Sequence, residues 1–250
     1  MADHWISRME ARADQAREGL LDDWMLEIIG PIADLDVIDL GCGEGRFGRM
    51  LASGGARPLG VDLQPAFIAR ARGLGGPAER YRVGDMTTLD GVEDEAFDLA
   101  VSYISLVDVP DQVAAVRQAY RVLRPGGRFV VCNLSPMATA VDRDDVWVRD
   151  PEGHKLHYVL DDYASEGPRE VRFGPERHLT NHHRMLSTTI NTFIETGFTV
   201  RRVHEPLPND EQMARVPDNG DLFRVPIFII YDLAKPLRDS PYGEPPLAPA

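Results

Sequence analysis

The stretch that decides the fold is Val37-Ile38-Asp39-Leu40-Gly41-Cys42-Gly43-Glu44-Gly45-Arg46-Phe47-Gly48. Its apolar beginning predicts a short buried strand over residues 37–40, and a helix is expected to start at Arg46. Between the two, the three glycines from Gly41 to Gly45 allow a tight turn and a close approach of the backbone to a ligand, because no Cβ is in the way. A strand, a glycine-rich turn and a helix N-terminus in this order predict a nucleotide site.

Composition limits what such a site can serve. The chain has 250 residues, enough for one α/β domain with insertions, and a formal net charge of −13. This charge argues against a nucleic-acid partner, because a protein that grips phosphates needs a basic face. The two cysteines, Cys42 and Cys132, form no CxxC pair, which is typical of a reduced cytosolic protein. We expect a cytoplasmic protein with no membrane partner, since neither a signal core nor a transmembrane run is visible.

Strands and helices are expected to alternate through residues 37–133. Further strands are predicted at 56–62, 79–83, 97–102 and 128–133, and helices at 65–72 and 110–123. Such alternation predicts a parallel sheet with helices on both faces. Two later strands, at 198–204 and 223–232, have no predicted helix between them and are expected to pair antiparallel at the sheet edge. The predicted fold class is α/β: a Rossmann-like, mostly parallel, seven-stranded sheet whose last strand is antiparallel.

The remaining segments predict a single domain over residues 1–235. An amphipathic helical segment at 1–30 precedes the first strand and is interpreted as a lid, with simple packing of Trp5 and Trp24 on the sheet as the alternative. Residues 135–178 and 206–221 are predicted to be cap insertions after strands five and six, and 179–196 to be a helix. Residues 236–250 form a proline-rich tail.

The identity of the nucleotide depends on which glycines matter. Gly43 to Gly48 satisfies the GxGxxG pattern of a dinucleotide site, and Asp62 lies near the expected position of its ribose-binding acid. However, the glycine run starts at Gly41, directly after the strand, and Asp39 lies two residues earlier. A carboxylate there would repel a pyrophosphate, so an acid at this strand end fits a cationic ligand better.

With these features the chain resembles the class I S-adenosylmethionine-dependent methyltransferases of the small-molecule type (methyltransferase type 11-like). The resemblance rests on the D-x-G-x-G-x-G pattern at 39–45 and on the segments 60–63, 84–86, 97–102 and 123–127. It implies S-adenosyl-L-methionine as cofactor, with Asp62 on the ribose hydroxyls, Asp85 on the adenine amine and the Met86 backbone N–H on the ring. The expected cofactor-binding residues are Asp39, Gly41, Cys42, Gly43, Asp62, Leu63, Asp85, Met86, Ser102 and Tyr103. Helix capping is the alternative role for the aspartates.

The expected methyl acceptor is a small, aromatic molecule of secondary metabolism. The Asn/Asp-Pro-Pro-aromatic tetrapeptide of many amine methylases is replaced here by Ser102-Tyr103-Ile104-Ser105, and no metal-ligand spacing appears near the site. Oxygen is the favoured acceptor atom, followed by carbon or nitrogen. The predicted substrate contacts are Tyr103, Tyr158, Tyr163 and Arg184. Surface ion pairing is the alternative role for Arg184.

Histidines are the predicted catalytic residues, because histidine is the usual general base near neutral pH. The candidates are His182, His183 and His157, which lie in or just after the first insertion. The alternative for His182 and His183 is that they merely begin the helix expected there. In the N-terminal lid, His4, Trp5 and Met9 are candidates for covering the cofactor.

Two other functions stay open at this point. The chain could be a non-catalytic, S-adenosylmethionine-binding regulatory protein on the same fold, or a protein or tRNA methyltransferase, which the acidic charge disfavours. We expect a small-molecule substrate and a monomer or homodimer.

Overall fold

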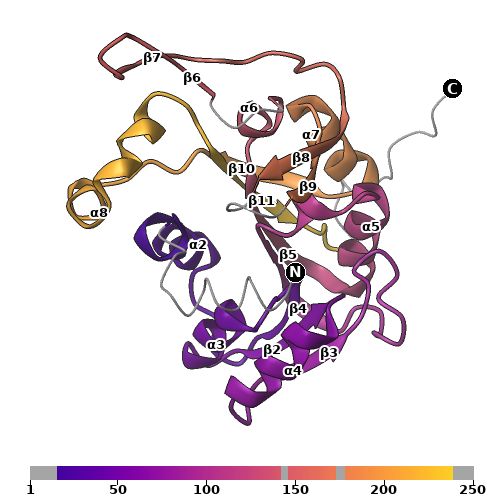
Figure 1. Ribbon diagram of the computed structural model, residues 1–250. Coiled ribbons are helices and arrows are strands. Elements are labelled where there is room, and N and C mark those ends of the chain that lie inside the picture. The colour runs from indigo at the N-terminus through magenta and orange to yellow at the C-terminus, as the bar shows by residue number, and fades with distance from the viewer. Residues whose placement is uncertain (1–15, 142–145, 173–177, 239–250) are drawn as a thin grey trace, which may run out of the picture.

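The computed structural model of the protein describes residues 16–141, 146–172 and 178–238 (Figure 1). They form a seven-stranded sheet in the order β10-β11-β5-β4-β1-β2-β3, and two separate hairpins, β6–β7 and β8–β9. The sheet strands are β1 (Asp36–Leu40), β2 (Arg57–Asp62), β3 (Arg80–Val83), β4 (Phe97–Tyr103), β5 (Leu123–Leu134), β10 (Thr199–His204) and β11 (Phe228–Ala234). Strands β1 to β5 run parallel, and β11 is antiparallel to both of its neighbours, so the predicted fold class is confirmed.

The strand order reverses between β1 and β4. From β1 the chain moves outward through β2 and β3, then returns to place β4 on the other side of β1. Ligands of open α/β sheets bind outside the carboxyl ends of the strands at such a switch point. The glycine turn predicted from the sequence follows β1 at this position.

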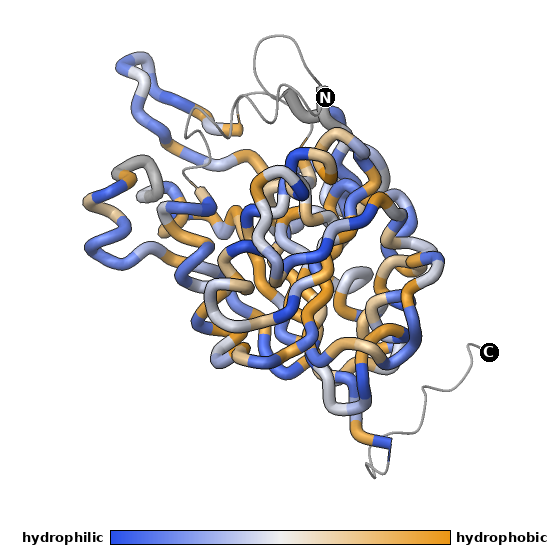
Figure 2. The backbone as a smooth tube through the Cα atoms, turned by 90° about the horizontal axis from the view of Figure 1, so that it is seen from below, coloured by the Kyte–Doolittle hydropathy of each residue, from blue (hydrophilic) through white to orange (hydrophobic). Residues whose placement is uncertain are grey.

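Helices cover both faces of the sheet and enclose two apolar clusters. On one face lie α5 (Gln112–Val122) and α7 (Leu186–Thr196), which bury Val116 and Phe193. On the other lie α2 (Asp22–Ile29) and α3 (Arg46–Ser53), which bury Met25 and Leu51. Helix α4 (Pro65–Leu74) packs beside β2 and β3. Figure 2 shows the hydrophobic segments gathered in the middle of the molecule.

The start of α2 is tied to the glycine turn by a charged cluster. Both carboxylate oxygens of Asp22 accept from the guanidinium of Arg46, at 2.8 Å each, and Oδ1 also accepts from the Tyr103 hydroxyl at 2.9 Å. Arg46 begins α3 and Tyr103 ends β4. The cluster therefore fixes α2 and the π-helical turn before it, Arg17–Leu21, on the switch point. The predicted lid residues His4, Trp5 and Met9 lie outside the described residues.

The prediction of a helix over residues 179–196 is wrong for residues 179–185. Residues His178–His183 form strand β9, which pairs antiparallel with β8 (Gly167–Arg172), and α7 begins only at Leu186. The reason is long-range: β9 has a partner strand whose charged sequence, Gly-Pro-Arg-Glu-Val-Arg, carries little strand signal of its own.

The two insertions also contain more regular structure than expected. The first holds α6 (Pro136–Thr139) and the hairpin of β6 (Trp147–Arg149) and β7 (Lys155–Tyr158). The second, expected to be a loop, contains α8 (Asp210–Arg215) and a 3₁₀ helix, Pro217–Phe223. A capping box starts α8: the Asn209 side chain accepts from the Gln212 N–H, and the Gln212 side chain accepts from the Asn209 N–H, both at 2.9 Å.

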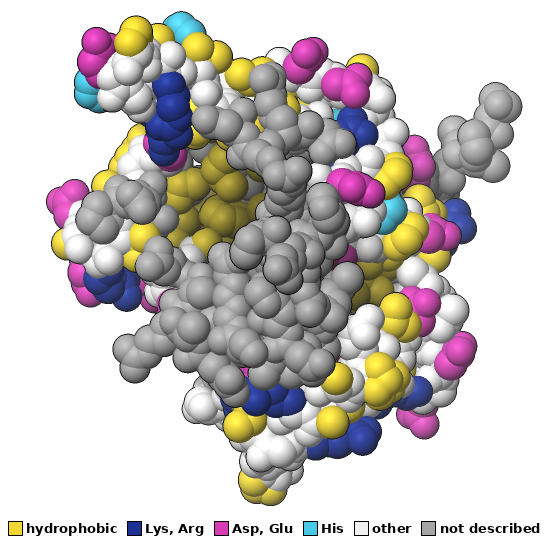
Figure 3. Space-filling model, in the orientation of Figure 1, with side chains coloured by type: hydrophobic (Ala, Val, Ile, Leu, Met, Phe, Trp, Pro, Cys, Tyr) yellow, Lys and Arg dark blue, Asp and Glu magenta, His cyan; other side chains and the backbone are white. Residues whose placement is uncertain are grey.

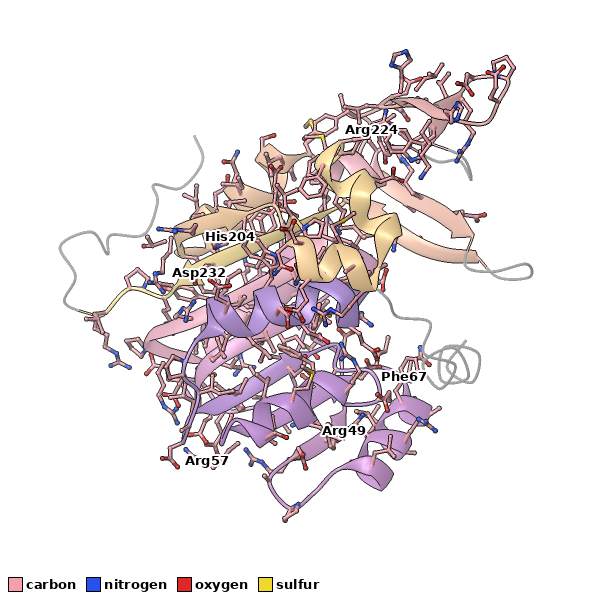
Figure 4. The ribbon with its side chains drawn as sticks, turned by 90° about the vertical axis from the view of Figure 1, so that its left-hand side faces the viewer. Arg49, Arg57, Phe67, His204, Arg224 and Asp232 are labelled. Carbon is pink, nitrogen blue, oxygen red and sulfur yellow. The ribbon has the colours of Figure 1, made fainter. Side chains whose placement is uncertain are left out.

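The insertions contact one another through what we call the Arg224 clamp, made of Arg224, Trp147, Lys155 and Asp221. The Arg224 guanidinium lies 4.4 Å from the centre of the Trp147 ring and donates to the backbone carbonyls of Lys155 and Leu156. The Lys155 ammonium forms an ion pair with Asp221. Figure 4 shows Arg224 at the end of the molecule opposite Arg57, which begins β2. The clamp joins the β6–β7 hairpin to the segment after α8.

A substitution at Gly45 tests how the Tyr81 ring packs against the glycine turn. Its φ is +78°, and a Cβ there would lie 2.6 Å from the Tyr81 ring, which is itself buried. We expect Gly45→Ala to lower the free energy of unfolding by about 3 kcal/mol, from left-handed strain and overpacking together.

Gly43→Ala is the matched control for this prediction. Gly43 also has a positive φ, +55°, but a Cβ there would meet no atom within 4 Å. Urea unfolding should therefore show a loss of only about 1 kcal/mol. Equal losses for the two variants would contradict the packing of Tyr81 against the turn.

Candidate functional site

The carboxyl ends of β1, β2 and β4 converge on the glycine turn. The Gly43 N–H donates to Asp62 Oδ2 at 2.9 Å, which joins the turn to the end of β2. The Ser105 hydroxyl, just after β4, donates to the Leu40 carbonyl at 2.6 Å and lies 2.7 Å from the Ser102 hydroxyl. These bonds bring the predicted residues Asp62 and Ser102 to the same edge as Gly41 and Gly43.

Asp39 is the most unusual group at this edge. It is 1% exposed, and its Oδ2 has no hydrogen-bond partner among the described residues. Burial raises the pKa of its carboxyl to about 7, the charge of Asp62 raises it further, and the charge of Arg17 opposes the rise. A buried acceptor without a partner is costly. Asp39 is therefore prepared for a cationic or hydrogen-donating ligand.

Asp62 and Leu63 form the next part of the edge. Asp62 Oδ1 accepts from the Gln64 N–H at 2.8 Å, so with Gly43 each carboxylate oxygen holds one backbone bond and keeps a free lone pair. Burial raises the pKa of Asp62, and these two bonds oppose it. The Leu63 side chain is 62% exposed beside it, an apolar surface available to a flat ring.

Asp85 and Met86 lie after β3. Asp85 is exposed, and its Oδ1 accepts from both the N–H and the hydroxyl of Thr87, each at 2.7 Å. This contact stabilises a turn, and since no helix directly follows Asp85 among the described residues, it is not the helix cap considered as the alternative. Met86 is partly buried against the core cluster under the α5 face.

Cys42 and Tyr103 are turned toward the protein interior. The Cys42 thiol is buried, and burial raises its pKa. The Tyr103 ring is 5% exposed, packs edge-on against Phe47 with 4.9 Å between ring centres, and uses its hydroxyl on Asp22. Its geometry serves the attachment of α2 and leaves no hydroxyl directed at a ligand.

The three candidate histidines have three different environments. His183 is fully buried, with Nδ1 2.8 Å from the Thr139 hydroxyl and Nε2 2.9 Å from the Tyr163 carbonyl. Both nitrogens are thus occupied. His157 is exposed on β7, in the hairpin that reaches outward in Figure 1. His182 is partly buried and lines a small pocket, and burial with the nearby Arg184 charge lowers its pKa.

The candidate substrate residues mostly hold the insertions in place. The Tyr158 hydroxyl donates to the Met137 carbonyl at 3.3 Å, and the Tyr163 hydroxyl accepts from the Leu186 N–H at 3.0 Å. Arg184 donates to the carbonyls of Val109 and Pro110 rather than to surface acids. Of these residues, Arg184 also lines the pocket beside His182.

Asp108 is a candidate that sequence reasoning missed. It ends the 3₁₀ turn Leu106–Asp108, directly after β4. The residue keeps an exposed surface, yet its carboxylate is largely enclosed, and this burial raises its pKa to about 6. The Asn181 amide, 2.6 Å away, and the Arg17 charge oppose the rise. The signal available in the sequence was its position, a lone acid just beyond the fourth strand end.

A hollow with hydrophobic walls opens near this edge, between α8, α2 and the β6–β7 hairpin (Figure 3). Ile104, Ile227 and Phe228 are partly exposed and pack against the apolar cluster that α2 and α3 cover. Within the described residues no cluster of His, Cys, Asp and Glu could hold a metal ion. No helix of that part of the chain is long and apolar enough to span a membrane.

Comparisons with known proteins agree with this geometry. A profile of the family described as "Methyltransferase domain" matches residues 38–131. A ubiquinone biosynthesis O-methyltransferase from Xanthomonas oryzae pv. oryzae is 33% identical over 107 residues, which are 42% of this chain and 45% of that protein. One from Bordetella avium is 30% identical over 137 residues, 53% of this chain and 57% of its own. The matches therefore span about half the length of these curated relatives.

A solved structure extends the similarity over nearly the whole chain. An S-adenosylmethionine dependent methyltransferase from Mesorhizobium loti superimposes with a TM-score of 0.75 at 31% sequence identity. The superposition covers 83% of this chain and 94% of that one. The structural similarity thus extends well beyond residues 38–131, which the family profile matches.

Proposed function

Because the chain belongs to the S-adenosylmethionine-dependent methyltransferases, we propose that it transfers a methyl group from S-adenosylmethionine to a hydroxyl oxygen of a small, aromatic metabolite. The observation that carries this proposal is the buried, unpartnered carboxylate oxygen of Asp39 beside the glycine turn. S-Adenosylmethionine has an ammonium and a sulfonium and no phosphate. Its charge therefore suits an acidic site that would repel a dinucleotide.

The residues present fit this cofactor. Asp39 Oδ2 has no partner within the described part of the chain, and Gly43 leaves space where a side chain would otherwise stand. Asp62 keeps lone pairs for hydroxyl donors, and Leu63 offers an exposed apolar surface for a ring. We assign Asp39, Gly43, Asp62 and Leu63 to the cofactor.

The cofactor supplies an electrophilic methyl group. What the protein must do is hold the acceptor in line with it, which is worth about 7–11 kcal/mol in favourable cases. The hydrophobic hollow beside the strand ends suits an apolar acceptor of modest size (Figure 3). The O-methyltransferase names of the curated relatives support oxygen as the accepting atom. The net charge of −13 disfavours tRNA.

Asp108 is our proposed base for the acceptor hydroxyl. Its raised pKa, about 6, lets it accept a proton near neutral pH while remaining mostly ionised. The Asn181 amide orients one oxygen of the carboxylate and leaves the other to act. His182, which lines the neighbouring pocket, is the competing candidate among the three histidines predicted from the sequence.

Turnover with simple phenols tests the proposal directly. The protein should release S-adenosylhomocysteine when incubated with S-adenosylmethionine and catechols or substituted phenols, measured by liquid chromatography with mass detection of the methyl ether. Anilines and bulk tRNA in parallel reactions serve as comparison acceptors. Binding of S-adenosylhomocysteine without turnover on any acceptor would favour the regulatory alternative, and methylation of tRNA alone would contradict the proposal.

Cofactor binding should be linked to the ionisation of Asp39. With its pKa at about 7, about half of Asp39 is protonated at neutral pH, and a cationic ligand binds the ionised form. The affinity for S-adenosylhomocysteine should rise with pH through 7, by up to about tenfold per unit below it, with proton release on binding. Calorimetry in two buffers of different ionisation heat measures both effects. Asp39→Asn should lose the proton release; an unchanged release in that variant would assign the proton elsewhere.

The pH profile of turnover should separate Asp108 from His182. With Asp108 as base, kcat/KM rises with pH through about 6, and Asp108→Asn removes this limb and lowers kcat by about 10²-fold or more. Asp111→Asn is the matched control, since Asp111 caps α5 through one exposed bond to Ala114 and asparagine caps equally well. Loss of the limb in His182→Gln but not in Asp108→Asn would transfer the role to His182.

A further inference from the structure

A small polar pocket lies on the α5 face of the sheet, beside the end of β5. Its polar wall includes Gln112 from the first turn of α5, Asn133 near the end of β5, and His182, Arg184 and Thr189 from the β9–α7 segment. Val107, Leu134 and Pro136 supply apolar wall, and none of the described residues that line the pocket carries a carboxylate. With Thr139 and Tyr231, which also line it, the residues come from seven elements between Leu106 and Ala234.

Two buried amides in this pocket lack partners. Gln112 is 4% exposed and its Nε2 has no acceptor, while Asn133 is 8% exposed and its Oδ1 has no donor, among the described residues. Buried polar groups of this kind are rare, because each forfeits its hydrogen bonds to water on folding. A ligand group that both accepts and donates a hydrogen bond would therefore satisfy the two amides together.

The charges around the pocket narrow that group further. The Arg184 guanidinium donates to the carbonyls of Val109 and Pro110. His182 is mostly neutral at pH 7, because burial and the Arg184 charge lower its pKa. A carboxylate could not satisfy Asn133 Oδ1, and an ammonium could not satisfy Gln112 Nε2. A hydroxyl satisfies both, since it donates one hydrogen bond and accepts others.

The pocket is next to the edge where the methyl acceptor must lie. Asn133 follows Cys132, whose carbonyl accepts from the Ile104 N–H at 2.8 Å. Ile104 precedes Ser105, whose hydroxyl holds the Leu40 carbonyl before the glycine turn. Val107 of the pocket wall immediately precedes Asp108. The pocket is thus connected to the glycine turn through the end of β4, and its wall is adjacent in sequence to the proposed base.

We propose that this pocket receives a hydroxyl group of the methyl acceptor as an anchor, with Gln112 Nε2 donating a hydrogen bond to its oxygen and Asn133 Oδ1 accepting the hydrogen bond that it donates. This hydroxyl is not the one that is methylated, since a donor directed at its oxygen makes it a poor nucleophile. The inference rests on the proposed function and names its acceptor class: an aromatic compound with a second hydroxyl group beside the reacting one.

The test uses phenol and toluene as probes, which differ only in the group that the pocket should recognise. In side-chain amide NMR spectra of the full chain saturated with S-adenosylhomocysteine, phenol should shift the Gln112 and Asn133 signals and toluene should not. The near-isosteric variants Gln112→Met and Asn133→Leu should each weaken phenol binding by about tenfold and leave toluene binding unchanged. Equal shifts from the two probes, or phenol binding unchanged in both variants, would overturn the inference.

The Tm is a second readout, because a purely structural role of Gln112 and Asn133 would change it in the opposite direction. Because the two amides lack partners before ligand binds, Gln112→Met and Asn133→Leu should leave the Tm unchanged or raise it. If an internal water bridged the amides and served only the fold, both variants would lower the Tm by several degrees, and the inference would fail. The control is Gln212→Met, which removes a buried amide that donates to Asp23 at 2.9 Å. It should lower the Tm and leave phenol binding unchanged.

Calorimetry with S-adenosylhomocysteine separates the two levels of the proposal. The Gln112 and Asn133 variants should bind it with the affinity of the unaltered chain. Failure of the unaltered chain to bind it overturns the proposed function. Normal binding of it, together with no preference for phenol over toluene, overturns the anchor pocket alone.

Discussion

The rest of the structure depends on how the chain leaves β1. The chain turns within five residues, and three neighbouring groups hold the turn. Ser105 donates to the Leu40 carbonyl, Asp62 accepts from the Gly43 N–H, and the Tyr81 ring packs against Gly45. Held in this way, the strand cannot shift to bring Asp39 to water. The protein therefore keeps a buried carboxylate with an unused oxygen, a cost in folding that a cationic cofactor would offset.

The hydrogen bonds that a polar side chain already makes distinguish structural from ligand-binding residues better than residue type does. His183 has a hydrogen bond on each ring nitrogen and belongs to the scaffold of the first insertion. Tyr103 likewise commits its hydroxyl to Asp22. Gln112 and Asn133, ordinary amides by type, carry the unused donor and acceptor. Groups that bind ligands are found where the fold leaves hydrogen-bonding capacity unused.

Local patterns were sufficient for residues 37–133, because strand periodicity, glycine turns and helix stops all act over a few residues. They also placed Asp39 and Asp62 at one edge, since parallel strands end together. They failed where partners are distant in sequence: β9 is a strand only because β8 lies beside it. Asp108 went unnoticed because its raised pKa comes from the protein folded around it. The start of α8 did carry a local signal, the capping-box pair Asn209 and Gln212, which the expectation of a loop overlooked.

The Arg224 clamp has a consequence for how such a scaffold can acquire new acceptors. The guanidinium on Trp147 and the ion pair of Lys155 with Asp221 join segments that lie more than sixty residues apart in the chain. If only one segment is replaced by that of a homologue, the charged side chains of the other segment lose their partners. Chimeras that transplant 147–158 together with 217–226 would keep these contacts, so we expect the two insertions to be exchangeable only as a pair.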